Sequence, residues 1–214
     1  NVIEGPHDRY GIIASGKAYN DTRQALADLG LDDDTCRRLG IRLHKVNVVW
    51  PLEATITRDF ATGLQEILVV EEKRQVIEYQ LKEELYNWRA DVRPNVLGKF
   101  DEPEGDFSGG EWAMPNPSDN WLLRAKADLT PAIIAKAIAK RLKKLGVPAD
   151  IAARMDQRIA VITAKEQALS TLEVKTGDRT PWFCSGCPHN TSTRVPEGSR
   201  AVAGIGCHYM VSWM

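Results

Sequence analysis

The sequence lacks the features typical of membrane, secreted or nucleic-acid-binding proteins. No apolar run approaches the roughly 20 residues of a membrane-spanning helix, and no basic and apolar leader opens the chain. The formal net charge of −1 provides no positive excess that would attract a polyanion. We therefore expect neither a membrane nor a nucleic acid as a partner. The chain also shows no internal repeat and no low-complexity tract.

Cysteine is scarce as well, and it is unevenly distributed. The 214 residues contain four cysteines, of which Cys36 stands alone in a stretch with helical character. The other three, Cys184, Cys187 and Cys207, fall within the last 31 residues. This usage is typical of a cytoplasmic protein with a metal site, and not of a secreted chain framed by disulfides.

What the first hundred residues do contain is an alternation of strand and helix patterns. Short apolar or alternating runs predict strands, and apolar residues at helical spacing predict helices. The expected strands are 10–15, 41–49, 66–71 and 94–100, and the expected helices are 21–31, 52–64 and 73–88. Asp21 is the expected cap of the first helix. Such an order favours βαβ crossovers, and so predicts a three-layer α/β domain with a parallel sheet.

The composition changes after this region. Residues 101–121 are rich in glycine, proline and acidic residues, which is typical of a linker. Thr130 as cap, Pro131 at the first helical position and Gly146 as the stop predict one helix, and a second is expected over 149–174. The lysines and arginine of the first helix are expected on a solvated face, although they could also form a basic patch.

Two short segments stand where α/β proteins often bind ligands, at the carboxyl ends of expected strands. Ser15-Gly16-Lys17 is reminiscent of a phosphate loop, but the GxxxxGK[ST] spacing is absent, so we expect a plain strand-to-helix turn. The run from Glu71 to Arg74 places opposite charges after the third strand. This pattern is more typical of a helix start than of a binding site.

The cysteine segment carries the most informative chemistry of the chain. Its CSGC and GIGC motifs contain Cys184, Cys187 and Cys207, and thiolates grouped in this way are soft ligands for iron–sulfur clusters or zinc. In the first reading a fourth ligand lies beyond Met214. In the second, His189 or His208 completes a zinc site. A thioredoxin-like redox pair and a packed loop of reduced cysteines without metal also remain open.

Three motifs in order, VVWPLE, ILVVEEKR and CSGCPH, resemble the indolepyruvate ferredoxin oxidoreductases, and most closely the long fused form of that 2-oxoacid oxidoreductase family. The resemblance implies that residues 1–121 form a transketolase-C-terminal-like α/β domain with a C-terminal linker. Residues 122–178 would be a helical connector, and 179–214 the truncated start of a thiamine-diphosphate-binding domain. We therefore expect an internal fragment of a longer polypeptide.

The resemblance also implies an activity for the parent protein. Such enzymes oxidatively decarboxylate aryl 2-oxoacids such as indolepyruvate with coenzyme A, and they pass electrons to ferredoxin. The implied cofactors are thiamine diphosphate, Mg²⁺ and 4Fe-4S clusters, and the implied assembly is a homo-oligomer. The family's GDG motif, which holds Mg²⁺ and the diphosphate, is missing from this chain. The isolated chain is therefore expected to be inactive.

Carried over residue by residue, the resemblance assigns two sets of positions in the cysteine segment. The cluster ligands would be Cys184, Cys187 and Cys207, and the thiamine pocket would be lined by His189, Gly204, Ile205 and Gly206. The alternative from another class is a non-catalytic zinc-binding α/β interaction module. A further alternative is a coenzyme-binding module without redox chemistry.

Overall fold

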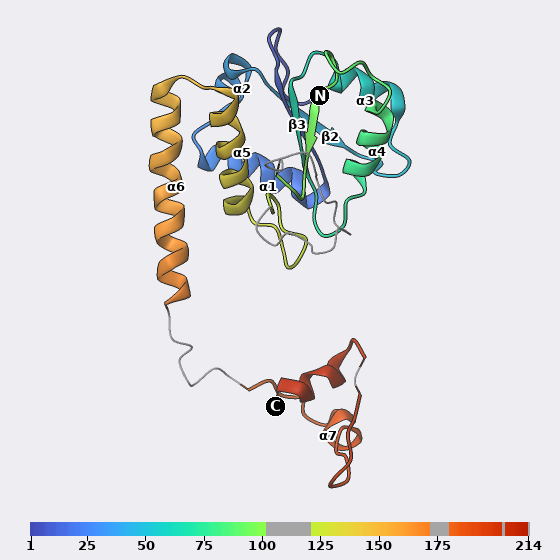
Figure 1. The fold of residues 1–214 in the computed structure, drawn as a ribbon. Helices are drawn as coiled ribbons and strands as arrows, with labels where there is room; N and C mark the ends of the chain where they lie inside the picture. Colours follow the sequence, from blue (N-terminus) through green and yellow to red (C-terminus); the bar gives the residue numbers. More distant parts are fainter. Residues whose placement is uncertain (102–120, 172–179, 203, 214) are drawn as a thin grey trace. The chain divides into compact units, whose positions relative to one another are not determined.

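The computed structural model describes residues 1–101, 121–171, 180–202 and 204–213 (Figure 1). The chain divides into two compact units, Asn1–Gln167 and Ala168–Met214. The first unit contains the whole sheet, and the second contains the three clustered cysteines. No helix in the described part of the chain combines the length and apolarity that crossing a lipid bilayer requires.

The first unit is built on a parallel sheet of four strands. These are β1 (Tyr10–Ser15), β2 (Ile41–Val46), β3 (Glu66–Val70) and β4 (Asn95–Leu97), in the spatial order β2-β1-β3-β4. Every paired neighbour is parallel. All five residues of β3 are buried, as expected for a strand with both faces covered. The sequence prediction of a parallel α/β sheet is confirmed.

Helices cover both faces of this sheet, which gives three layers (Figure 1). Helices α1 (Gly16–Asp28) and α5 (Pro131–Leu145) lie on one face, and α3 (Ala54–Ala61) and α4 (Ile77–Leu85) on the other. Successive side chains of a strand point to opposite faces. Accordingly Ile12 and Ala14 belong to the hydrophobic cluster under α1 and α5, whereas Ile13 belongs to the cluster under α3 and α4.

Several predicted boundaries were wrong, most clearly that of the first helix. Helix α1 begins at Gly16, five positions before Asp21, and its N-cap is the extended residue Ser15. The added turn is held because Ala18 and Thr22 are buried, and the Thr22 hydroxyl donates to the Ala18 carbonyl at 2.7 Å. The other predicted elements of the first hundred residues exist, but β2, α3, β3, α4 and β4 are shorter than predicted. Cys36 lies in a helix, α2 (Asp33–Leu39), which confirms the helical character expected of its surroundings.

Helix α5 matches its prediction closely. The Thr130 hydroxyl accepts a hydrogen bond from the Ile133 amide, Pro131 occupies the first turn, and Gly146 ends the helix. The following helix is α6 (Ala149–Ser170), and the predicted end of that helix, at 174, lies outside the described residues. Lysines of α5 form ion pairs and not a free basic patch. The pairs are Lys136–Glu166, Lys140–Asp101 and Lys143–Asp156.

The predicted solvated face is wrong at Arg141. This arginine is only 2% exposed, and its Nε and Nη2 atoms donate to the two carboxylate oxygens of Glu66, at 2.7 and 2.5 Å. Its Nη1 atom donates to Asp101 at 2.7 Å. The ion pairs attach α5 to the start of β3. Helix α5 is thus part of the first unit, and the predicted division of the chain at 121 and 178 stays a prediction.

Candidate functional site

The CSGC motif forms a tight knuckle in the second unit. The amide of Cys187 donates to the carbonyl of Cys184 at 3.0 Å, and Gly186 between them has a φ of +74°, a conformation that glycine adopts without strain. The side-chain amide of Asn190 also donates to the Cys184 carbonyl, at 3.2 Å. Glycine at this position therefore suits the tight turn between the two cysteines. The knuckle leads through Pro188 into the short helix α7 (His189–Ser192).

Two histidines connect the parts of this unit. Nδ1 of His189 lies 3.1 Å from Sγ of Cys187. The His189 ring stacks with the ring of His208 at a centroid distance of 6.1 Å, and with that of Phe183 at 5.3 Å. The sequence contained no signal for the stacking, because His189 and His208 are far apart along the chain. The stack places the knuckle beside the GIGC segment.

The GIGC segment folds back on His208. The amide of Gly204 donates to Nε2 of His208 at 3.0 Å, and the 3-10 helix η1 (Cys207–Trp213) follows directly. Gly206 has a φ of +153°, and a Cβ added there would lie 3.0 Å from Cε1 of His208. A side chain at this position would therefore strain the turn. Ile205 is fully exposed, so the backbone of this loop is open to approach from outside.

The three clustered cysteines have the right donor chemistry for a soft metal, but the structure does not bring them together as a set. Cys184 and Cys207 are exposed, and Cys187 is half-buried. Within the described residues, no group of three or more His, Cys, Asp or Glu side chains is placed so that it could hold a metal ion. The described residues by themselves therefore do not assemble a complete cluster or zinc site. The ligand roles of Cys184, Cys187 and Cys207 stay predictions.

Cys36 differs from the clustered cysteines in its burial and in its surroundings. Its side chain is fully buried in the first unit, and burial raises the pKa of its thiol to about 12. Its Sγ lies 3.8 Å from the carbonyl oxygen of Leu31. Cys36 is thus a packing residue, as its isolated position in the sequence indicates.

At the carboxyl edge of the sheet, charged side chains form ion pairs with one another. The order of strands reverses between β1 and β3, which is where open α/β sheets commonly bind ligands. There Nζ of Lys17 donates to Asp21 at 2.6 Å, to Glu72 at 2.9 Å and to the carbonyl of Leu129 at 3.0 Å. The carboxylates of Asp21 and Glu72 raise the pKa of Lys17 above its ordinary value, chiefly through the hydrogen bond to Asp21. The prediction of a structural turn at Ser15-Gly16-Lys17 is confirmed.

Glu71, at the end of β3, serves the start of helix α4. Its carboxylate accepts hydrogen bonds from the amides of Val76, Ile77 and Glu78, at 2.9, 2.9 and 3.1 Å. Burial nevertheless raises the pKa of this carboxyl above its ordinary value. The predicted helix-start role of the charged run is confirmed for Glu71. A carboxylate that already satisfies three amides is not available as a ligand.

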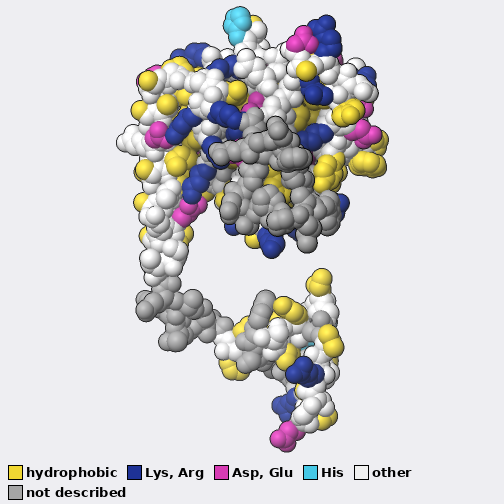
Figure 2. Space-filling model, in the orientation of Figure 1, with side chains coloured by type: hydrophobic (Ala, Val, Ile, Leu, Met, Phe, Trp, Pro, Cys, Tyr) yellow, Lys and Arg dark blue, Asp and Glu magenta, His cyan; other side chains and the backbone are white. Residues whose placement is uncertain are grey.

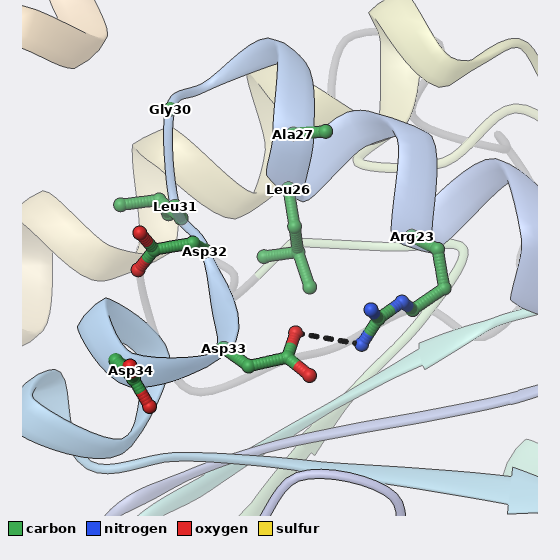
Figure 3. Close-up of a pocket in the computed structure, with 8 residues that line it drawn as sticks. All are labelled: Arg23, Leu26, Ala27, Gly30, Leu31, Asp32, Asp33 and Asp34. Carbon is green, nitrogen blue, oxygen red and sulfur yellow. Dashed lines mark ion pairs between the residues drawn. The ribbon is translucent and has the colours of Figure 1, made fainter.

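A hollow of about 630 Å³ opens between α1 and α2 (Figure 3). Three acidic residues line it, and each carboxylate is already engaged. Asp32 accepts from the Thr35 amide at 2.8 Å and caps α2, Asp33 pairs with Arg23 at 2.9 Å, and Asp34 pairs with Arg37 at 2.8 Å. The hydrogen bonds from Thr35 lower the pKa of Asp32. These acids stabilise the turn between the helices, and the hollow shares no residue with the cysteine segment.

Comparison with known proteins gives consistent results. The model of the indolepyruvate ferredoxin oxidoreductase middle domain matches residues 1–172. Indolepyruvate oxidoreductase subunit IorA of Thermococcus kodakarensis is 28% identical over 216 residues, which cover 97% of this chain and 27% of that protein. Subunits of the same name from Pyrococcus horikoshii and Methanothermobacter thermautotrophicus are 37% and 31% identical over 97 residues. These matches cover 45% of this chain and 13% and 14% of the two relatives. The match thus spans only 27% of the length of the Thermococcus relative.

Proposed function

The chain belongs to the indolepyruvate ferredoxin oxidoreductase family, and on this premise we propose that it is an internal part of an enzyme that oxidatively decarboxylates aryl 2-oxoacids. The substrate would be indolepyruvate or a related acid, coenzyme A would accept the acyl group, and ferredoxin would accept the electrons. One observation carries the proposal. The similarity to the Thermococcus subunit covers 97% of the chain, so it runs from the α/β unit into the cysteine segment.

The proposed cofactors of the parent enzyme are thiamine diphosphate with Mg²⁺ and 4Fe-4S clusters. Thiamine diphosphate supplies an electron sink for decarboxylation, and clusters carry single electrons. The residues of this chain would contribute only part of the two sites. We assign Cys184, Cys187 and Cys207 as cluster ligands, and the remaining ligand would come from a part of the parent outside this chain.

The thiamine pocket would be lined by His189 and by the loop Gly204-Ile205-Gly206. The exposed loop and the positive φ of Gly206 support this role, because a bare backbone permits close approach of a ligand. His208 would hold the loop in position through its bond from the Gly204 amide. Because the chain contributes only part of each site, we expect it to be inactive by itself.

The experiment that tests this proposal is an assay of the parent enzyme beside the isolated chain. The anaerobically purified parent is given indolepyruvate, coenzyme A and a low-potential electron acceptor, with and without thiamine diphosphate. We expect acyl-CoA and reduced acceptor only from the parent, and only when thiamine diphosphate is present. A parent that turns over without thiamine diphosphate, or an isolated chain that turns over, would contradict the proposal.

The rival function is a zinc-binding α/β interaction module without catalysis. The contact between Cys187 and His189 is compatible with this reading, because cysteine and histidine commonly bind zinc together. Metal analysis separates the two functions. Stoichiometric zinc in the parent, without iron or sulfide, would favour the rival and overturn the cluster assignment.

A further inference from the structure

The VVWPLE motif, residues 48–53, has no role in the function proposed above. It follows β2 at the carboxyl edge of the sheet and leads into α3. Val48, Val49 and Trp50 are 65%, 38% and 70% exposed, and Val76 at the start of α4 is 40% exposed. We call these four residues the loop patch. Single exposed apolar side chains are ordinary, whereas neighbouring ones mark interaction surfaces.

Gln80 shows that the loop lies beside the start of α4. This glutamine of α4 is buried, and its Nε2 atom donates to the carbonyls of both Val49 and Val76, each at 2.8 Å. Its Oε1 atom accepts from the Leu52 amide at 2.7 Å. A single buried amide thus joins the loop to the helix. Figure 2 shows hydrophobic side chains at the surface over the side of the molecule formed by α3 and α4.

The loop is held in this position, and its apolar side chains divide between the core and the surface. Leu52 packs against the hydrophobic cluster under α3 and α4. Trp50, two positions earlier, remains 70% exposed on a backbone that Gln80 holds on both sides of it. Tryptophan gains more from burial than most side chains, and a fixed backbone reduces the entropy lost on docking. The loop patch is therefore suited to bury Trp50 against another surface.

The borders of the loop patch indicate which chemistry fits it. The N-termini of α3 and α4 adjoin it, and helix N-termini commonly attract anions. Here both are occupied by the chain's own carboxylates. Glu53 accepts from the amides of Thr55 and Ile56, at 3.1 and 2.6 Å, and Glu71 caps α4. A phosphate or carboxylate ligand would find these amides already bonded, so an apolar protein surface fits better.

We propose that the loop patch is a docking surface for another domain of the same polypeptide, formed by residues outside 1–214. The comparison with the Thermococcus relative supplies the occupant. The match covers 27% of that protein, so about three quarters of its length lies outside the matched region and is available to cover the loop patch. The exposed Trp50 on a fixed loop provides an apolar anchor of the kind that dominates such contacts. This inference requires the family assignment but not the proposed cofactor ligands.

Site-directed photo-crosslinking in the full-length parent tests the proposal. Trp50→p-benzoylphenylalanine retains a large aromatic side chain at an exposed position, so folding should be preserved. After irradiation, the main crosslinked product should run at the mass of a single chain on a denaturing gel, because the crosslink lies within one polypeptide. Mass spectrometry should then identify crosslinks from position 50 to peptides outside 1–214.

The control is Tyr86→p-benzoylphenylalanine, at the other end of α4, where the side chain is 74% exposed. It should yield those same peptides at least several-fold less often. A product of doubled mass would show that a second copy occupies the loop patch, and a crosslink to a different protein would show a separate partner. Either result, or a yield no higher than that of the control, would overturn the proposal.

Discussion

Arg141 and Glu66 form a buried ion pair joined by two hydrogen bonds, although they are 75 positions apart in the chain. Their side chains are 3% and 4% exposed. Removal of one partner from such a pair leaves an uncompensated buried charge, which commonly costs about 3–5 kcal/mol. We therefore expect Arg141→Ala to lower the free energy of unfolding of the first unit by about that amount, as measured by urea titration with circular dichroism.

The matched control for this substitution is Lys143→Ala on the same helix. Lys143 pairs with Asp156, but both side chains are well exposed, at 41% and 57%. Exposed pairs contribute about 0–1 kcal/mol. The free energy of unfolding of Lys143→Ala should therefore be almost that of the unsubstituted chain. Equal losses in the two variants would contradict the structural role that we assign to Arg141.

The ion pair also shows what the sequence could not predict. Helical spacing in α5 indicates one apolar face, on which Ile134, Ile138 and Leu142 are buried and Ile133 is half-buried, because local periodicity determines which face of a helix is apolar. Arg141 belongs to the apolar side only because Glu66 and Asp101 meet it there, and those partners come from distant segments. A local pattern contains no information about such partners.

His44 provides a pH dependence. Burial, and then the charge of the amino terminus, lower the pKa of His44 from 6.5 to about 4. The unfolded chain therefore binds a proton on this residue that the folded chain does not bind between these two values. The free energy of unfolding should fall as the pH drops from 6.5 towards 4, and above 6.5 this penalty is absent.

The comparison for His44 is the variant His44→Gln, measured by urea titration at several pH values. Glutamine keeps a polar side chain beside Asn1, whose Oδ1 atom lies 3.0 Å from Nδ1 of His44. The variant should lose stability less steeply than the original chain as the pH falls below 6.5. Parallel curves for the two proteins would show that His44 makes no such contribution.

The four cysteines should differ strongly in reactivity. Thiolate is the reactive form, and Cys36 is fully buried with its pKa raised to about 12, whereas Cys184 and Cys207 are exposed. Under anaerobic conditions near pH 8, we expect iodoacetamide to modify the two exposed cysteines at least about tenfold faster than Cys36. Peptide mass mapping measures the rates. In denaturant the difference should vanish, and rapid labelling of Cys36 in the folded chain would contradict the burial.

Gln80 should control the order of the loop that carries Trp50. Gln80→Ala removes the bonds to Val49 and Leu52, and an unsatisfied buried group commonly costs about 1–3 kcal/mol. We expect faster hydrogen exchange at the Leu52 amide in this variant. The control Glu83→Ala changes an exposed residue of the same helix and should leave that exchange unchanged. Unaltered exchange in Gln80→Ala would show that the loop is held by other contacts.

The cysteine segment shows a second limit of the sequence. The turn of the knuckle depends on local sequence, because the glycine between the two cysteines readily adopts the positive φ that Gly186 has. The stacking of His189 on His208 could not be predicted, since it depends on how two separate segments fold together. The completion of a metal site is equally non-local. Three cysteines supply suitable donors, but the described residues alone do not assemble them.

We propose that Cys184, Cys187 and Cys207 bind an iron–sulfur cluster in the parent enzyme. The most direct test of this claim is the iron, sulfide and zinc content of the anaerobically purified parent and of three single variants, Cys184→Ser, Cys187→Ser and Cys207→Ser, with Ser185→Ala as control. We predict that each cysteine variant loses about four iron and four sulfide per chain, while Ser185→Ala keeps them. Unchanged iron in the cysteine variants, or one zinc per chain lost from them, would contradict the claim.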